Sequence, residues 1–327
     1  LPYAADLVNL VVISESSDVP EHEVMRVLAP NGAMFKDGFV QRKSTPETID
    51  EWSHFLYGPG NNAVSRDTAV GPVGGLKWMC GPLWSRSHEF TSSLSILVSA
   101  GGRVFYVVDE GIISITTPNI PERWALIARD AFNGKLLWRM PLPEWRSRLG
   151  RSKALRSVPS TAQRCIVADQ GRLFFSALLG DAVKVLDAAT GKVLATHAVT
   201  EGTREFVKVG GSLILYQEKA GARGQGRIAR VDAGTGELLW AATNDRYRGE
   251  SLAATQKYVT YHNGQELICL DYASGQRRWL EVRPSSIEQR KPVRLSRVCL
   301  LYTSPSPRDR SAYRVCRLLL EKGGGGG

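Results

Sequence analysis

The chain has 327 residues, of which 43% are hydrophobic and 23% charged, so it is long enough to bury the core of one or two domains. Its formal net charge is +10, and its five cysteines show no CxxC spacing, which argues against a zinc ribbon or a full disulfide framework. No apolar run of the sequence has the length of a membrane-spanning helix.

Residues 1–40 predict a short α/β unit. The apolar run Leu7–Ile13 is typical of a buried strand, and Glu21–Leu28, which follows Pro20, has the spacing of an amphipathic helix. Residues Arg26–Phe35 then predict the end of the helix, a turn and a second strand. A β-α-β order of this kind indicates a parallel pair of strands.

This unit resembles the second half of a class I S-adenosylmethionine (SAM)-dependent methyltransferase. Leu1–Asp6 is similar to the segment that leads into the fourth strand of that family, and Arg26–Phe35 to the passage into the fifth. Asn31 stands where the family has a glycine, and asparagine tolerates a left-handed turn. The family holds SAM through a Gly-rich loop and an acidic residue that precede this region. The resemblance therefore implies the C-terminal remnant of such a domain, with SAM bound only in a full-length parent; an unrelated β-α-β unit is the alternative.

A nine-residue motif, Asp-Ala-x-x-Gly-x-x-x-Trp or a close variant, occurs four times, at spacings of roughly 57, 45 and 39 residues. Such periods are typical of propeller blades. The Asp predicts a turn cap, the Gly a left-handed turn position and the Trp a contact with the next blade. Ala195 replaces Trp in the second copy, so we expect a weaker interface there. The motif positions are Asp130, Gly134 and Trp138; Asp187 and Gly191; Asp232, Gly236 and Trp240; and Asp271, Gly275 and Trp279.

Four apolar runs surround each motif copy, separated by turn pairs. They predict a mainly β fold: a partial β-propeller over residues 76–285, with about four four-stranded antiparallel blades of a larger ring, behind the short α/β N-terminal remnant. Residues 41–75 are expected to be a linker, and residues 286–298 are assigned to neither part. The expected strands are Ile96–Ser99, Arg103–Val108, Leu126–Asp130, Leu136–Met140, Cys165–Ala168, Arg172–Ser176, Val183–Asp187, Val193–Thr196, Phe206–Val209, Leu213–Tyr216, Ile228–Asp232, Leu238–Ala241, Ser251–Ala254, Tyr258–His262, Leu267–Asp271 and Arg277–Glu281.

These repeats resemble the pyrroloquinoline-quinone (PQQ) repeat family, which includes quinoprotein dehydrogenases and non-enzymatic propellers such as the outer-membrane assembly lipoprotein. Together with the methyltransferase-like end, the segments Ile49–His54, Asn61–Val64 and Trp84–His88 resemble large multidomain proteins of planctomycete-type bacteria. By analogy with exported propellers, the resemblance implies a periplasmic or exported protein. It also implies that the remainder of the chain's own propeller is a missing partner of these blades.

The resemblance implies a calcium-bound quinone only where a carboxylate base and acidic or amide metal ligands are present. The sequence shows no catalytic set, no metal-ligand spacing and no vicinal cysteine pair, so neither PQQ nor calcium is expected. Asp109 and Glu110 end a strand of the first blade and, with Arg86 and His88, could bind a polar ligand. A solvated hairpin end is the alternative, and His54, close to two asparagines, has the same ambiguity.

Residues 299–327 follow neither the blade pattern nor a heptad. Cys299–Asp309 resembles a translated sequencing adapter, Arg317–Lys322 its far end and Gly323–Gly327 a run of G base calls; a basic disordered tail is the alternative. This tail holds five basic and two acidic residues, so it supplies +3 of the net charge of +10. The basic cluster Arg146–Arg156 is expected to be a solvated loop. Because no aromatic residues interleave with it, no nucleic-acid partner is expected.

Taken together, the sequence favours a fragment of a multidomain bacterial propeller protein that binds a protein or a glycan without catalysis and without a cofactor of its own. One alternative is a SAM-dependent methyltransferase in the full-length parent. The other is an oxidoreductase similar to PQQ-dependent alcohol dehydrogenases. An upstream Gly-x-Gly loop would favour methylation, and calcium-dependent quinone binding would favour oxidation.

Overall fold

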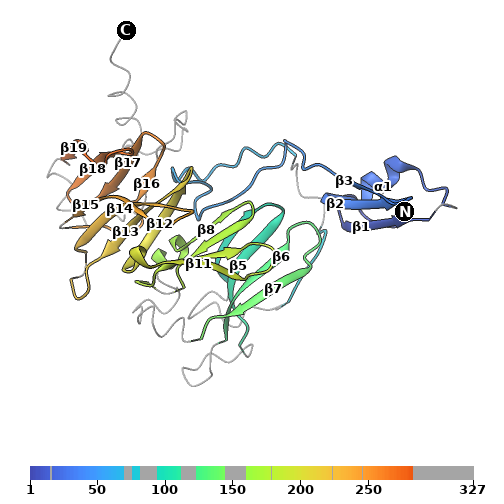
Figure 1. Ribbon diagram of the computed structural model, residues 1–327, viewed down its shortest axis with the longest axis horizontal. Coiled ribbons are helices and arrows are strands. Elements are labelled where there is room, and N and C mark those ends of the chain that lie inside the picture. The colour runs from blue at the N-terminus through green and yellow to red at the C-terminus, as the bar shows by residue number, and fades with distance from the viewer. Residues whose placement is uncertain are drawn as a thin grey trace, which may run out of the picture.

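The computed structural model describes residues 1–14, 17–69, 76–81, 94–111, 123–143, 160–177, 179–222, 224–244 and 246–282. In these ranges, four four-stranded antiparallel sheets follow one another along the chain, and a smaller α/β unit lies at one end (Figure 1). Each four-stranded sheet is one blade, and its strands are in chain order from one edge to the other.

All the blade strands lie close to their expected positions, which confirms the prediction of a mainly β, partial propeller. Blade one contains β4 Leu94–Ala100, β5 Arg103–Asp109, β6 Trp124–Asp130 and β7 Leu136–Pro141; blade two contains β8 Ile166–Asp169, β9 Arg172–Phe175, β10 Val183–Asp187 and β11 Val193–His197. Blade three contains β12 Thr203–Val209, β13 Ser212–Glu218, β14 Gly226–Asp232 and β15 Leu238–Asn244; blade four contains β16 Ala253–Ala254, β17 Tyr258–His262, β18 Glu266–Asp271 and β19 Arg277–Val282. Short 3₁₀ turns lie at Ser160–Arg164 and Ala198–Thr200.

The inner strands of blades two and three are apolar on both faces because each of these two blades has a neighbour on either side. In β9, Leu173 and Phe175 belong to the core shared with blade one, whereas Phe174 belongs to the core shared with blade three. All three are essentially inaccessible to solvent. Since successive side chains of a strand point to opposite faces, one short strand fills two interfaces.

The motif aspartates close the last hairpin of each blade, as expected. In every copy, one carboxylate oxygen (Oδ1) accepts hydrogen bonds from the backbone N–H groups two and three residues later, as from Gly234 and Thr235 to Asp232, both at 2.8 Å. The motif glycines follow in the left-handed region, with φ between 72° and 80°. The sequence therefore specifies the turn through an Asp cap and a positive-φ Gly.

A second reason for the motif glycine is the aromatic ring of the preceding blade. A Cβ atom added to Gly191 would lie 2.6 Å from the Trp138 ring, and one added to Gly275 would lie 2.6 Å from the Trp240 ring. The indole N–H of Trp138 also donates to the backbone carbonyl of Ala188, at 3.0 Å. Trp138 and Trp240 thus each pack on the motif turn of the next blade, and the role of Trp279 stays a prediction.

The interface after blade two departs from this pattern. Ala195 is only partly buried, but His197, two residues further along β11, places its ring against Gly236. Its Nε2 atom lies 3.1 Å from the backbone oxygen of Ala233, the position equivalent to the indole bond. The imidazole therefore takes the place of the missing indole, and the strength of this interface stays a prediction.

Trp78 was not recognised as part of the repeat, but it belongs to the same series. Its ring lies against Gly134, where an added Cβ would meet it at 2.4 Å, and its indole N–H donates to the backbone oxygen of Ala131 at 3.1 Å. The residues around it therefore occupy the place of the outer strand of a blade that precedes blade one.

The N-terminal unit has the predicted β-α-β order. Strands β1 Val8–Ile13 and β2 Leu28–Lys36 are parallel, α1 Glu21–Val27 joins them, and a third strand, β3 Phe39–Arg42, pairs antiparallel with β2. The expected turn before the second strand is an irregularity inside β2, where Asn31 has a φ of 65°. The unit contacts the motif turn of blade one through polar groups, with Asn9 donating to Asp130 at 2.8 Å.

Candidate functional site

The segment after β3, which the sequence analysis treated as part of a linker, is built into the propeller. We call residues 50–61 the strap; it runs across the first strands of all four blades (Figure 1). Backbone N–H groups near the ends of these strands donate to it: Ser99 to the oxygen of Trp52 (2.8 Å), Ala168 to that of Ser53 (2.9 Å), Lys208 to Nε2 of His54 (3.0 Å) and Ala254 to the oxygen of Pro59 (2.9 Å). Since the first strand of a blade has a free edge, the strap satisfies donors that would otherwise be unpaired.

His54 has a structural role in the strap. Because Nε2 accepts the N–H of Lys208, the ring proton is on Nδ1, which lies 2.7 Å from the hydroxyl of Ser53. Burial, and to a smaller extent the charge of Arg164, lowers the pKa of His54 to about 3. The imidazole is therefore neutral near pH 7, and neither nitrogen is left to accept a proton from a substrate.

A buried ion pair anchors the end of the strap. The Arg164 guanidinium lies 3.2 Å from the Glu205 carboxylate, and it also donates to the side-chain oxygen of Asn61 at 2.9 Å. Glu205 accepts two further bonds, from the N–H groups of Glu250 (2.9 Å) and Leu252 (3.1 Å). Burial raises the pKa of Glu205, which Arg164 and these N–H groups oppose. The network joins blades two, three and four to the strap, and its two charges are paired with each other.

The predicted polar-ligand residues are only partly described. Asp109 is buried, and its carboxylate accepts the N–H groups of Gly111 (2.9 Å) and Arg123 (2.8 Å), so it closes a loop. Glu110 forms an ion pair with Arg139 at 2.6 Å. Arg86 and His88 lie outside the described residues, so the predicted joint site stays a prediction.

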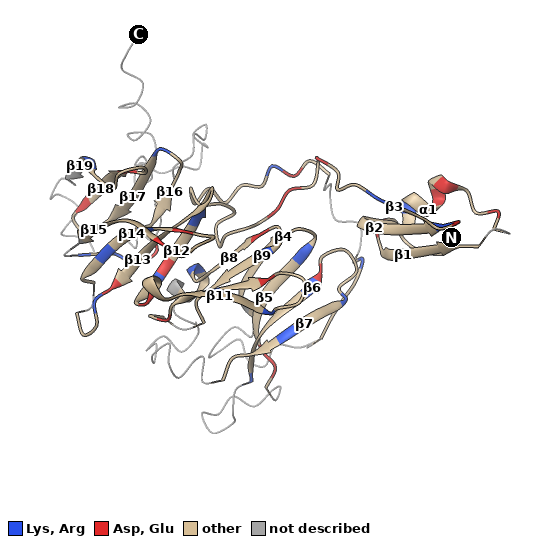
Figure 2. Cartoon of the chain, in the orientation of Figure 1, with Lys and Arg blue, Asp and Glu red and all other residues tan. Residues whose placement is uncertain are grey.

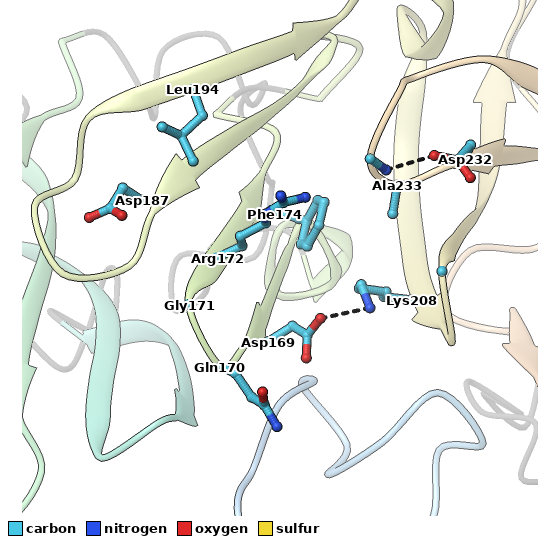
Figure 3. Close-up of a pocket in the computed structure, with 12 residues that line it drawn as sticks. Asp169, Gln170, Gly171, Arg172, Phe174, Asp187, Leu194, Lys208, Asp232 and Ala233 are labelled. Atoms are coloured by element: carbon cyan, nitrogen blue, oxygen red, sulfur yellow. Dashed lines mark hydrogen bonds and ion pairs between the residues drawn. The ribbon is translucent and has the colours of Figure 1, made fainter. Parts of the chain in front are cut away.

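Two adjoining clefts lie between blades two and three, of about 570 and 490 Å³. The larger is formed by the β8–β9 turn, the motif turns of both blades and Leu194 (Figure 3). The smaller lies between this region and the strap, and Asp50, His54, Tyr57 and Arg66 line it. The ion pair of Lys208 and Asp169, at 2.7 Å, is part of both linings.

The larger cleft carries charges of both signs, as do the blades generally (Figure 2). Asp187 and Asp232 contribute carboxylates, Arg172 a guanidinium and Gln170 an amide. Hydrogen bonds from Thr190 lower the pKa of Asp187, and those from Thr235 and Gly234 lower the pKa of Asp232, so both are ionised. No local motif of the sequence indicates this cleft, although Ala195 in place of Trp marks the interface on which it lies.

A calcium ion would need several oxygen ligands that converge on one point. Within the described ranges, no three His, Cys, Asp or Glu side chains converge as metal ligands. The buried carboxylate of Glu205 is already engaged by Arg164 and two N–H groups. In the same ranges, no helix has the length and hydropathy needed to cross a bilayer.

Part of the blade region is similar to a known repeat family. Residues 144–281, less than half of the chain, match the family described as outer membrane protein assembly factor BamB. No curated protein matches the sequence. BamB from Moraxella catarrhalis is 13% identical, with a TM-score of 0.36, over 59% of this chain and 62% of that structure. Quinohemoprotein alcohol dehydrogenase from Comamonas testosteroni is 16% identical, with a TM-score of 0.39, over 61% of this chain and 36% of that structure.

The aligned region therefore spans about a third of the quinohemoprotein alcohol dehydrogenases and less than two thirds of BamB. A europium-containing methanol dehydrogenase is also similar, at 12% identity and a TM-score of 0.44, over 71% of this chain and 49% of that structure. Enzymes and an assembly factor are thus among the similar structures, and likenesses this distant assign no activity to the chain.

Proposed function

We propose that the propeller region is a non-catalytic binding module for a protein or a glycan partner, in a protein exported to the periplasm. The observation that carries this proposal is the strap. It crosses the centre of the blade array and uses its His and Asn side chains to hold backbone groups and Arg164. The titratable groups nearest the centre therefore act as structural hydrogen-bond partners.

An oxidoreductase would need a base that can accept the proton of an alcohol as hydride leaves. His54 offers no free nitrogen, and Glu205 is paired with Arg164. This chemistry favours the binding module over a dehydrogenase. The match to the BamB family over residues 144–281 also supports a protein partner.

The test is direct. The purified chain is titrated with PQQ in the presence of Ca²⁺, with tryptophan emission as the readout, and is then assayed for dye-linked oxidation of methanol and ethanol. We expect no saturable quinone binding and no dye reduction. Calcium-dependent binding together with alcohol oxidation would replace the binding-module proposal with the dehydrogenase.

A second function is proposed for the N-terminal unit alone, as the closing part of a methyltransferase-like domain in a longer parent protein. The parallel pair β1–β2 with α1 between its strands favours this assignment. We expect the present chain not to bind SAM in equilibrium dialysis. Saturable binding by this chain would contradict the idea that the SAM-holding residues lie upstream.

A further inference from the structure

The larger cleft between blades two and three has features of a ligand site that no other function of the chain explains. Its volume of about 570 Å³ lies within the usual range of pockets for small ligands. It lies at the interface where His197 replaces the indole of the repeat. Figure 3 shows the side chains that surround it.

The motif aspartates on this cleft differ from the other two. The second carboxylate oxygen (Oδ2) of Asp130 accepts Asn9, and that of Asp271 accepts Arg278. In Asp187 and Asp232, only the first oxygen is used by the turn. Among the described residues, no group donates to the second oxygen of either one. These two acceptors are therefore free to bind a ligand.

Free donors lie on the same lining. Arg172 and Gln170 are both exposed, and their side chains form no hydrogen bond within the described part of the chain. Leu194, 53% exposed, adds an apolar surface. The cleft therefore offers carboxylate acceptors, guanidinium and amide donors and an apolar patch together.

A sugar hydroxyl both donates and accepts, so a ring that carries several hydroxyls can use both kinds of group, and its C–H face can use the apolar patch. The carboxylates would repel an anion, and Arg172 and Lys208 would repel a cation. We propose that this cleft binds a neutral saccharide of one to three units. The proposal rests on the proposed binding function and selects the glycan as its ligand.

The test is isothermal titration of the full chain with four neutral probes, maltotriose, cellotriose, mannotriose and triacetylchitotriose, at millimolar concentration. We expect saturable binding of at least one of them. Arg172→Ala removes a charged donor and should weaken binding about tenfold. Leu194→Trp should weaken binding because the larger side chain occupies part of the cleft.

The matched control is Leu239→Trp, at the same motif position in blade three and 47% exposed, but outside the cleft; its affinity should be unchanged. Absence of binding to all four probes would overturn the proposal, as would equal affinity in Leu194→Trp and the unmodified chain. Binding of trilysine that Leu194→Trp weakens would also overturn it, in favour of a peptide. Dye-linked alcohol oxidation, measured on the same samples, would instead overturn the binding module itself.

Discussion

The contact between Trp240 and Gly275 makes a prediction whose size can be worked out from the geometry. In Gly275→Ala, the new Cβ would lie 2.6 Å from two ring atoms of Trp240, and the residue would keep a φ of 72°. The left-handed conformation costs an alanine about 1–2 kcal/mol. Forcing the ring to move adds about 1–3 kcal/mol of overpacking. We therefore expect the free energy of unfolding to fall by about 2–5 kcal/mol.

Two matched variants separate these contributions. Gly221 has a φ of 75° with nothing within 4 Å of its added Cβ, so Gly221→Ala should cost only the conformational part, about 1–2 kcal/mol. Gly211 has neither a positive φ nor a close neighbour, so Gly211→Ala should change stability by less than about 1 kcal/mol. Urea unfolding followed by tryptophan emission gives the three midpoints.

A contribution of Trp240 to the cost is refuted if Gly275→Ala costs no more than Gly221→Ala. That result would mean that the Trp240 ring moves freely and does not constrain the turn. The double variant Gly275→Ala with Trp240→Ala offers a further check, since removal of the ring should recover the overpacking part of the loss and produce a non-additive cycle.

Three further predictions concern buried groups. The folded state holds His54 neutral with a pKa of about 3, against 6.5 in the unfolded chain. The contribution of His54 to the free energy of unfolding should therefore be fully present above pH 6.5 and be lost as the pH drops toward 3. His54→Gln should flatten the acid side of a pH series of urea midpoints, and the exposed His22→Gln should not. Glu205→Gln leaves the Arg164 charge buried without its partner and should cost about 3–5 kcal/mol by urea unfolding, whereas replacing both residues with apolar ones should cost less. Trp138→Phe keeps a ring on the next turn but loses the indole hydrogen bond and some buried apolar surface. The free energy of unfolding of this variant should therefore fall by the loss from the apolar surface and by about 1 kcal/mol more for the hydrogen bond.

The regular part of the fold could be predicted because its signals are local. The Asp cap and the positive-φ Gly lie within five residues of each other, and alternating apolar runs define the strands around them. His197 could not be predicted as the substitute for the indole, since the motif position is occupied by Ala195 and a ring two residues away reaches the same turn only in three dimensions. Trp78 was missed for a related reason: Gly74 stands four residues before it, as in the other copies, but Val70 takes the place of the Asp that marks them.

The strap was the largest difference between expectation and structure. Its sequence has no periodicity, and its order comes from backbone groups on four separate strands that are far away along the chain. Composition alone suggests a linker in such a case. Trp52, Ser53 and His54 hold fixed positions because the backbone N–H groups on the free strand edges need hydrogen-bond acceptors. The candidate site could not be predicted from local sequence for the same reason, since residues from separate turns line the cleft.

The strap and the saccharide cleft meet at Lys208, which is held at two points. His54 accepts its backbone N–H, while its side chain forms the ion pair with Asp169 on the wall of the cleft. His54→Ala should therefore weaken saccharide binding severalfold, although His54 does not line the larger cleft. His54→Gln, whose side-chain oxygen can accept the same N–H, should restore most of the affinity. If both variants bind as the unmodified chain does, the strap does not position Lys208. If both lose stability but only His54→Ala loses affinity, the hydrogen bond to Lys208 sets the geometry of the cleft.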